Sequence, residues 1–170
     1  AGGPGAMLNR EAMQRPRPAS TAAGAFGGNA TTPLSLAQAD YDAFEQLLGR
    51  VQDAYGREDA ATLRSLVTPE MHGYFGEEIT ENQRKNVHNL TSDAKLLQGD
   101  LSEAWSEATG EYATVAMRYA LLETTVERGT GRVLEGDAST PTETTELWTF
   151  VRRPGSGAAG WRLSAIQQTA

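Results

Sequence analysis

The spacing of hydrophobic residues divides the chain into a helical half followed by a strand-rich half. Large apolar residues recur at intervals of three and four between Tyr41 and Tyr55, which is the repeat of an amphipathic helix. A capping-box pattern at Ser35 and a glycine at Gly56 predict where this helix begins and ends. We expect its apolar stripe to pack on a sheet rather than on a partner or a membrane. The stripe consists of Tyr41, Phe44, Leu48, Val51 and Tyr55.

Two further helices are predicted between this helix and the strands. The first covers residues 58–66 and is expected to bury Ala60, Leu63, Leu66 and Val67. The second begins with Thr68 as its cap and Pro69 at the first helical position, where the missing N–H does no harm. Its buried residues repeat every four positions: Met71, Phe75 and Ile79. Residues 80–89 are polar, and we expect an exposed extension of the helix or a mobile loop there.

From Asp93 onward the pattern changes towards alternation. Residues 94–106 are predicted as the first long strand, with a bulge or bend at Gly99-Asp100. Residues 112–126 are predicted as the second, because they are rich in Thr, Val and Tyr. A helix is the alternative for that segment, since some of its apolar residues also fit a 3.6-residue period. We interpret residues 127–142 as a connection, with a short strand at 132–134.

The last segment, Glu143–Gln168, has the pattern of a β-hairpin around a turn rich in Gly and Pro. In its first arm Trp148 and Phe150 share a face. In its second arm Trp161, Leu163 and Ala165 alternate with Arg162, Ser164 and Ile166. Two strands alone cannot cover such large side chains. Helices followed by strands therefore predict an α+β fold, in which an antiparallel sheet of three to four strands packs on N-terminal helices.

Residues 1–34 differ from the rest in composition. Residues 1–33 contain six of the 18 glycines and four of the seven prolines, without any apolar period. Such a segment cannot bury enough surface to offset the entropy of ordering. We predict a flexible, disordered linker over residues 1–34 and one folded domain over residues 35–170. A spacer role is favoured for residues 15–18 over docking on an acidic or aromatic groove.

Charge narrows the range of partners. Residues 35–170 hold 12 basic and 21 acidic residues, a net charge of −9, whereas residues 1–34 have a net charge of +2. Nucleic acid and anionic lipid both require basic surfaces, so we expect neither to bind the domain directly. The absence of cysteine excludes disulfides and thiolate metal sites. No apolar run approaches the roughly 20 residues that span a bilayer.

Candidate chemistry is sparse. His72 and His88 are the only histidines, and their separation matches no metal-ligand motif. Glu77, Glu78 and Glu123 could act as general bases, but we expect them to be solvated. No nucleophile or phosphate-loop motif is present. The sequence therefore predicts no catalytic residue, no metal and no cofactor.

Several segments together resemble a known family. They are residues 55–64, 68–71 and 74–75 near the start and residues 131–136, 146–152 and 161–168 near the end. In order and spacing this pattern is similar to the domain named for the Tim forty-four subunit of the mitochondrial inner-membrane import machinery. The resemblance covers about residues 36–168. Bacterial members of the family also place a Gly-rich linker before the domain.

The resemblance implies a cone-like α+β fold, related to the cystatin-like and nuclear transport factor two-like families, in which a curved antiparallel sheet wraps around helices. It implies a non-enzymatic adaptor or scaffold at the bacterial inner membrane. The family's membrane contact would correspond to residues 35–55. Asp40, Asp42, Glu45 and Asp53 would face anionic headgroups unfavourably there, so we expect the domain to be soluble and its membrane anchor to lie upstream of residue 1.

We expect a protein client, or a chaperone or translocation component, to bind in a cleft between the first helix and the sheet. Its expected lining is Phe44, Leu48, Tyr55, Phe75 and Trp148. An acidic rim would favour basic clients. The alternative is a small-molecule-binding protein or a lyase-like or isomerase-like enzyme, because the same cone fold hosts such enzymes. The sequence is also compatible with a homo-oligomer.

Overall fold

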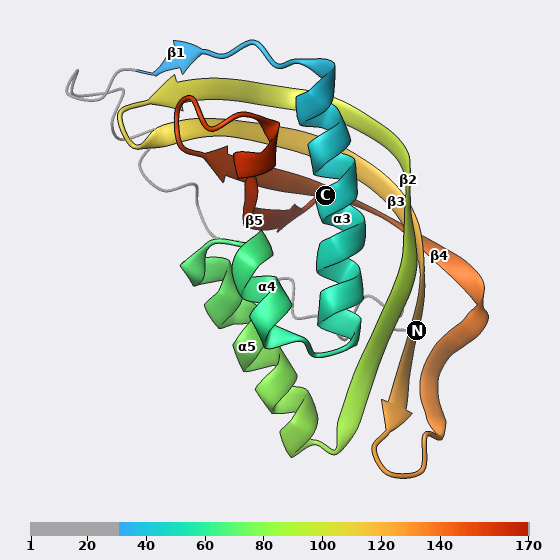
Figure 1. Ribbon diagram of the computed structural model, residues 1–170. Coiled ribbons are helices and arrows are strands. Elements are labelled where there is room, and N and C mark those ends of the chain that lie inside the picture. Colours follow the sequence, from blue (N-terminus) through green and yellow to red (C-terminus); the bar gives the residue numbers. More distant parts are fainter. Residues whose placement is uncertain (1–30, 170) are drawn as a thin grey trace.

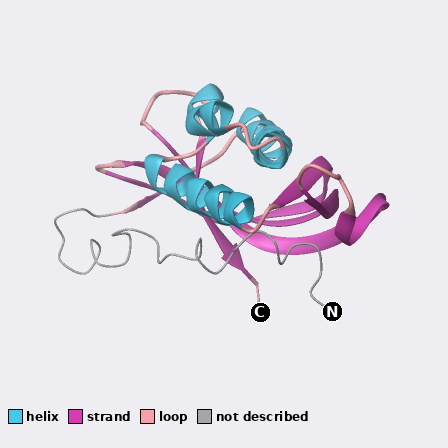
Figure 2. Ribbon diagram, turned by 90° about the horizontal axis from the view of Figure 1, so that it is seen from below, coloured by secondary structure: helices cyan, strands magenta, loops and turns pink. Residues whose placement is uncertain are grey.

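The computed structural model describes residues 31–169, which form one curved antiparallel sheet with helices on one of its faces (Figures 1 and 2). The strand order is β1-β2-β3-β4-β5, so each strand pairs with its neighbour in sequence. This arrangement confirms the predicted α+β class, although the sheet has five strands rather than three to four. The elements are β1 (Thr32–Pro33), α3 (Gln38–Gly56), α4 (Ala60–Leu66), α5 (Pro69–Arg84), β2 (Val87–Glu107), β3 (Gly110–Glu127), β4 (Val133–Arg152), the 3₁₀ turn η2 (Ala158–Gly160) and β5 (Arg162–Gln168).

Bulges account for the curvature of the sheet. The pairing of β2 with β3 shifts register at three places, and that of β3 with β4 at two. Each bulge adds an unpaired residue that bends and twists the strand. The bulge predicted at Gly99-Asp100 is displaced, because Gly99 pairs regularly with Met117 and the shifts lie on either side of it. The long strands consequently curve around α3 (Figure 1).

The core lies between α3 and the predicted hairpin. The Phe44 ring stacks on Phe150 with 4.3 Å between centroids and meets Trp161 edge-on at 5.0 Å. The hairpin is confirmed, but its second arm does not alternate strictly. A register shift between β4 and β5 at Thr149/Phe150 turns Ile166 inward, so that it is fully buried like Leu163.

The helix boundaries differ from the prediction at one end. α3 starts at Gln38 rather than at Ser35, because the Asp40 carboxylate, not the Ser35 hydroxyl, accepts the backbone N–H that begins the helix, that of Ala37, at 2.8 Å. α3 ends at Gly56 as predicted, and a Cβ there would overlap the carbonyl oxygen of Thr91 on β2. The close approach of α3 to β2 thus requires glycine at this position.

The two shorter helices largely follow the prediction. Asp59 caps α4, whose first residue, Ala60, is exposed rather than buried. Thr68 caps α5, and Pro69 occupies its first position as expected. The apolar residues predicted for the buried face of α5 are all buried: Met71, Phe75 and Ile79.

Two polar segments have more regular structure than the sequence predicted. Of the two alternatives for residues 80–89, the helical extension is confirmed as far as Arg84, where α5 ends, and β2 begins at Val87. Residues 127–142 are mostly strand, because β4 begins at Val133 and pairs with the end of β3. Residues 133–141 are exposed, and Val133 and Glu135–Asp137 among them pair with β3, so pairing rather than burial holds this part of β4 in the sheet. Hydrophobic alternation therefore gives no signal for this part of β4.

Part of the segment predicted as a linker is ordered. Thr32 pairs with Ser106 and Pro33 with Trp105, and these two residues form β1 at the edge of the sheet. The rest of that prediction, residues 1–30, lies outside the described residues.

Candidate functional site

The five residues predicted to line a cleft are packed in the core. Each side chain is at most 1% exposed: Phe44, Leu48, Tyr55, Phe75 and Trp148. Tyr55 contacts Phe75, with 5.7 Å between ring centroids, and Trp148 contacts Phe150. In this arrangement their side chains fill the space between the helices and the sheet. Their binding role therefore stays a prediction, and only Phe44 among them borders one of the cavities described next.

An open groove remains between α3 and β2, and we call it the acidic groove. It consists of two adjoining cavities of about 180 and 490 Å³ that share Glu45. The smaller cavity has an apolar floor to which α3 contributes Phe44 and the sheet contributes Val115 and Met117. The acidic groove is lined by Gln38, Tyr41, Asp42, Phe44, Glu45, Gln46, Gly49, Arg50, Asp53, Asp93, Ala94, Leu96, Gly99, Val115 and Met117.

Carboxylates dominate the rim of the acidic groove, with four of them against a single guanidinium, that of Arg50. Two have cations beside them, because Arg57 pairs with Asp53, and Lys95 lies 3.9 Å from Asp93. Among residues 31–169, no cation pairs with Asp42 or Glu45. The face of α3 that borders the groove therefore presents two uncompensated negative charges next to an apolar floor.

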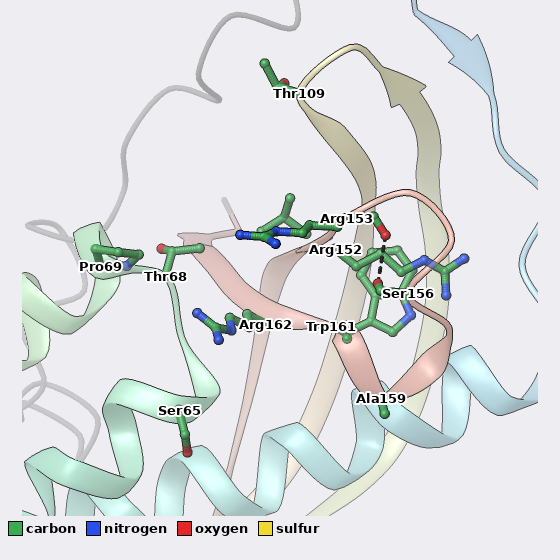
Figure 3. A pocket seen from close by; sticks show the side chains of 12 residues that line it. Ser65, Thr68, Pro69, Thr109, Arg152, Arg153, Ser156, Ala159, Trp161 and Arg162 are labelled. Atoms are coloured by element: carbon green, nitrogen blue, oxygen red, sulfur yellow. Dashed lines mark hydrogen bonds between the residues drawn. The ribbon is translucent and has the colours of Figure 1, made fainter.

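A separate cavity, of about 550 Å³, lies between the β4–β5 hairpin and the junction of α4 with α5, and we call it the arginine pocket (Figure 3). Its lining contains three arginines and several hydroxyl groups but no acidic residue. The lining residues are Ser65, Thr68, Pro69, Thr109, Val151, Arg152, Arg153, Ser156, Ala159, Gly160, Trp161 and Arg162.

One arginine of the pocket belongs to a buried polar network. Arg152 donates to Asp40 at 2.8 Å and to Glu111 at 2.7 Å, and its guanidinium lies 4.4 Å from the centre of the Trp161 ring. The Trp161 indole N–H also donates to Asp40, at 3.0 Å. Burial raises the pKa of Asp40, but hydrogen bonds from Trp161 and Ala37 and the charge of Arg152 outweigh it, so the pKa is below its usual value. Asp40 is thus buried and paired, and does not face outward as predicted.

A second buried carboxylate, Glu146, lies at the centre of the sheet. It is fully buried, and its oxygens accept hydrogen bonds from the Tyr119 hydroxyl at 2.7 Å, the Trp148 indole at 3.0 Å and the Gln168 amide at 3.1 Å. Gln52 of α3 joins the network by donating to Tyr119 at 3.2 Å. This network could not be predicted from the sequence, because Glu146 appears there as one of several acidic residues in a polar run.

The other candidate residues are dispersed. His72 contacts the carbonyl oxygen of Ala60 at 3.0 Å, and His88 contacts that of Gly56 at 2.7 Å. The second contact caps the end of α3. Glu123 is only 2% exposed and so is not solvated as predicted. No group of three or more candidate metal ligands occurs within residues 31–169.

Comparisons with known proteins agree with this architecture. The crystal structure of the intermembrane space region of chloroplast protein ARC6 superposes with a TM-score of 0.52 at 10% identity, covering 81% of this chain and 100% of that one. A periplasmic fragment of TraM (TM-score 0.37, 15% identity, 79% and 100% covered) and an NTF2-like superfamily protein from Salmonella enterica serovar Typhimurium LT2 (0.41, 13%, 78% and 92%) are more distant.

The search of curated proteins gave no match. Within residues 31–169, none of the helices combines the length and the apolar character that a membrane span requires. The family model of the Tim44-like domain matches residues 30–168, which include every helix and strand described above. The chain therefore belongs to the Tim44-like domain family.

Proposed function

We propose that this domain is a non-enzymatic scaffold of a membrane-associated assembly and that it binds a basic, amphipathic protein segment in the acidic groove. The observation that carries the proposal is the pairing of an apolar floor with a carboxylate-rich rim along α3. Apolar side chains of the segment would enter the smaller cavity, and its cations would meet Asp42 and Glu45. Electrostatic complementarity of this kind sets specificity and association rate.

Attachment to the membrane would come from a segment outside the domain. The α3 surface along the groove carries Asp42, Glu45 and Asp53, which would be repelled by anionic lipid. Membership of the Tim44-like family supports a role in a membrane-associated complex. A client or chaperone of the translocation type fits such a role.

The alternative, a lyase-like or isomerase-like enzyme, needs an acid–base pair that a substrate can reach. Glu146 is the most deeply buried carboxylate described, and the lining of neither the acidic groove nor the arginine pocket includes it. Its oxygens already accept from three neutral donors. We therefore assign Glu146 to the stability of the sheet rather than to catalysis.

The test is a fluorescence anisotropy titration of the domain with a labelled basic amphipathic peptide. We expect saturable binding that weakens as salt concentration rises. The double variant Asp42→Asn, Glu45→Gln should weaken binding by about two- to fivefold per charge, the equivalent of about 0.5–1 kcal/mol each. Glu77→Gln with Glu135→Gln is the matched control, because both side chains are exposed and neither lines the acidic groove.

Two outcomes would contradict the proposal. One is equal loss of peptide affinity in both double variants, which would show that only the total charge matters. The other is tight binding of residues 35–170 to phosphatidylglycerol liposomes without peptide binding, which would make the domain itself the membrane anchor.

A further inference from the structure

The arginine pocket has a charge opposite to that of the domain around it. Residues 35–170 hold 21 acidic and 12 basic residues, yet the lining of this pocket includes three arginines and no carboxylate. Only Arg152 is neutralised, through Asp40 and Glu111. The guanidinium groups of Arg153 and Arg162 make no ion pair or hydrogen bond with any residue from 31 to 169. The pocket therefore has an uncompensated positive charge.

The two free guanidinium groups extend into the same space. Arg153, the first residue after β4, and Arg162, at the start of β5, both extend from the hairpin towards Thr68, as Figure 3 shows. They are close in space because the hairpin returns the chain after the turn, and Val151 pairs with Arg162. Both side chains are exposed, so a ligand could reach them from solvent.

The opposite wall of the pocket supplies further donors. Thr68 caps α5, and its hydroxyl oxygen accepts from the Met71 N–H at 3.4 Å. That bond leaves the hydroxyl hydrogen of Thr68 free to donate. The 16-residue helix α5 also begins at this wall with Pro69, so the positive end of its dipole lies beside the two arginines.

We propose that the arginine pocket binds the phosphate group of a small anionic ligand. Guanidinium groups on one wall and a hydroxyl on the other approach a bound anion from different directions. A tetrahedral phosphate offers acceptor oxygens in all of these directions, whereas a planar carboxylate offers two oxygens in one plane. The net negative charge of the domain does not prevent this, because charges beyond about 8–10 Å are largely screened at physiological salt.

This site does not depend on the acidic groove. The acidic groove is formed by α3, β2 and β3, whereas the arginine pocket is formed by the hairpin, the α4–α5 junction and the β2–β3 turn. No residue lines both. Failure of peptide binding in the acidic groove would therefore leave this proposal intact.

The experiment is an NMR titration of the isotope-labelled 170-residue chain with inorganic phosphate, glycerol 1-phosphate and acetate at constant ionic strength. We expect saturable shifts of the Arg153 and Arg162 side chains and the Thr68 amide with both phosphate compounds, and weaker binding of acetate. Arg162→Gln and Arg153→Gln should each weaken phosphate binding at least fivefold. Arg50→Gln removes the same charge from the acidic groove and should change it less than twofold.

The source of the phosphate is tested by adding phosphatidylglycerol vesicles. Vesicle binding that is lost in Arg162→Gln would identify a lipid headgroup as the ligand. If the vesicles leave the shifts caused by inorganic phosphate unchanged, the ligand is a soluble phosphate compound. Shifts that fail to saturate, or that weaken equally in Arg50→Gln, would overturn the site. Acetate binding as tight as phosphate binding would overturn the ligand class.

Discussion

The acidic groove and the arginine pocket differ in how each obtains its charge. The acidic groove takes three of its four carboxylates from the outer face of one helix, where successive turns place Asp42, Glu45 and Asp53 along the same side. The arginine pocket takes its three guanidinium groups from two paired strands, Arg152 on β4 and Arg162 on β5, and from Arg153 in the turn between them. The first arrangement can be recognised in the sequence, and the second exists only after the hairpin has formed.

The contrast shows what a net charge can and cannot predict. A value of −9 for residues 35–170 correctly suggests an acidic surface along α3. It does not exclude a local site for an anion, because charges interact over distances much shorter than the diameter of the domain. The ion pair of Asp40 with Arg152 joins the two regions, since Asp40 lies in the first turn of α3 and Arg152 is the last residue of β4.

The largest effect is expected when the core beneath both regions is broken. Trp148 is fully buried and donates to Glu146, so Trp148→Ala should lower the free energy of unfolding by about 3–5 kcal/mol. Denaturant unfolding followed by circular dichroism would measure this. Trp148→Phe keeps an aromatic ring of smaller volume and removes the indole N–H, so its loss of unfolding free energy should be smaller than that of Trp148→Ala. An unchanged unfolding midpoint in Trp148→Ala would refute the packing described here.

The next largest effect is expected when the link between the two regions is removed. Arg152→Gln leaves Asp40 buried without its cation, and we expect a loss of about 3 kcal/mol in unfolding free energy. Arg118→Gln is the control, because its pair with Glu143 is exposed and should be worth less than about 1 kcal/mol. Equal losses in the two variants would mean that the Asp40–Arg152 pair does not join α3 to the hairpin energetically.

A smaller effect concerns pH. The pKa of Asp40 is lower in the folded state than in an unfolded chain, where it is about 3.9. The stability that this carboxylate provides is therefore present above about pH 4 and is lost as pH falls through the folded-state pKa. Asp40→Asn should be less stable at pH 7, and its stability should fall less steeply below pH 4. An unchanged slope of unfolding free energy against pH would contradict the assignment.

The smallest effects separate the two sites from each other. Asp42→Asn should weaken binding of a basic peptide by about two- to fivefold and leave phosphate binding unchanged. Arg162→Gln should weaken phosphate binding at least fivefold and leave peptide binding unchanged. Both variants would be measured with both ligands at one salt concentration. If either variant changed both affinities equally, the sites would be coupled or the total charge alone would govern binding.

Much of the fold follows from local patterns in the sequence. The stripe on α3, the Thr68-Pro69 start of α5 and the turn between β4 and β5 each have a signal within a few residues. The predicted start of α3 was wrong because the Ser35 hydroxyl matches the pattern of a capping box. In the structure the helix is capped instead by Asp40, which accepts the N–H of Ala37. A short strand was predicted at residues 132–134, but its continuation through the first half of β4 was missed because those residues are exposed and show no hydrophobic alternation.

The candidate sites were harder to predict than the fold. Apolar residues such as Phe44 and Trp148 were assigned to a cleft, yet an apolar periodicity does not distinguish a packed core from an open lining. The arginine pocket depends on Thr68 lying opposite Arg162, nearly one hundred positions later in the sequence. Its only signal in the sequence was an Arg-rich turn, which is also typical of ordinary exposed turns.

Trp161 lies where the arginine pocket meets the core, and this gives the molecule a built-in optical reporter. Its ring lies under the Arg152 guanidinium and lines the pocket, whereas Trp148 is fully buried and does not line it. Indole emission responds to nearby charge, so an anion entering the pocket should change the fluorescence of Trp161 and leave that of Trp148 unaltered. Binding at the hairpin could thus be followed without any added label.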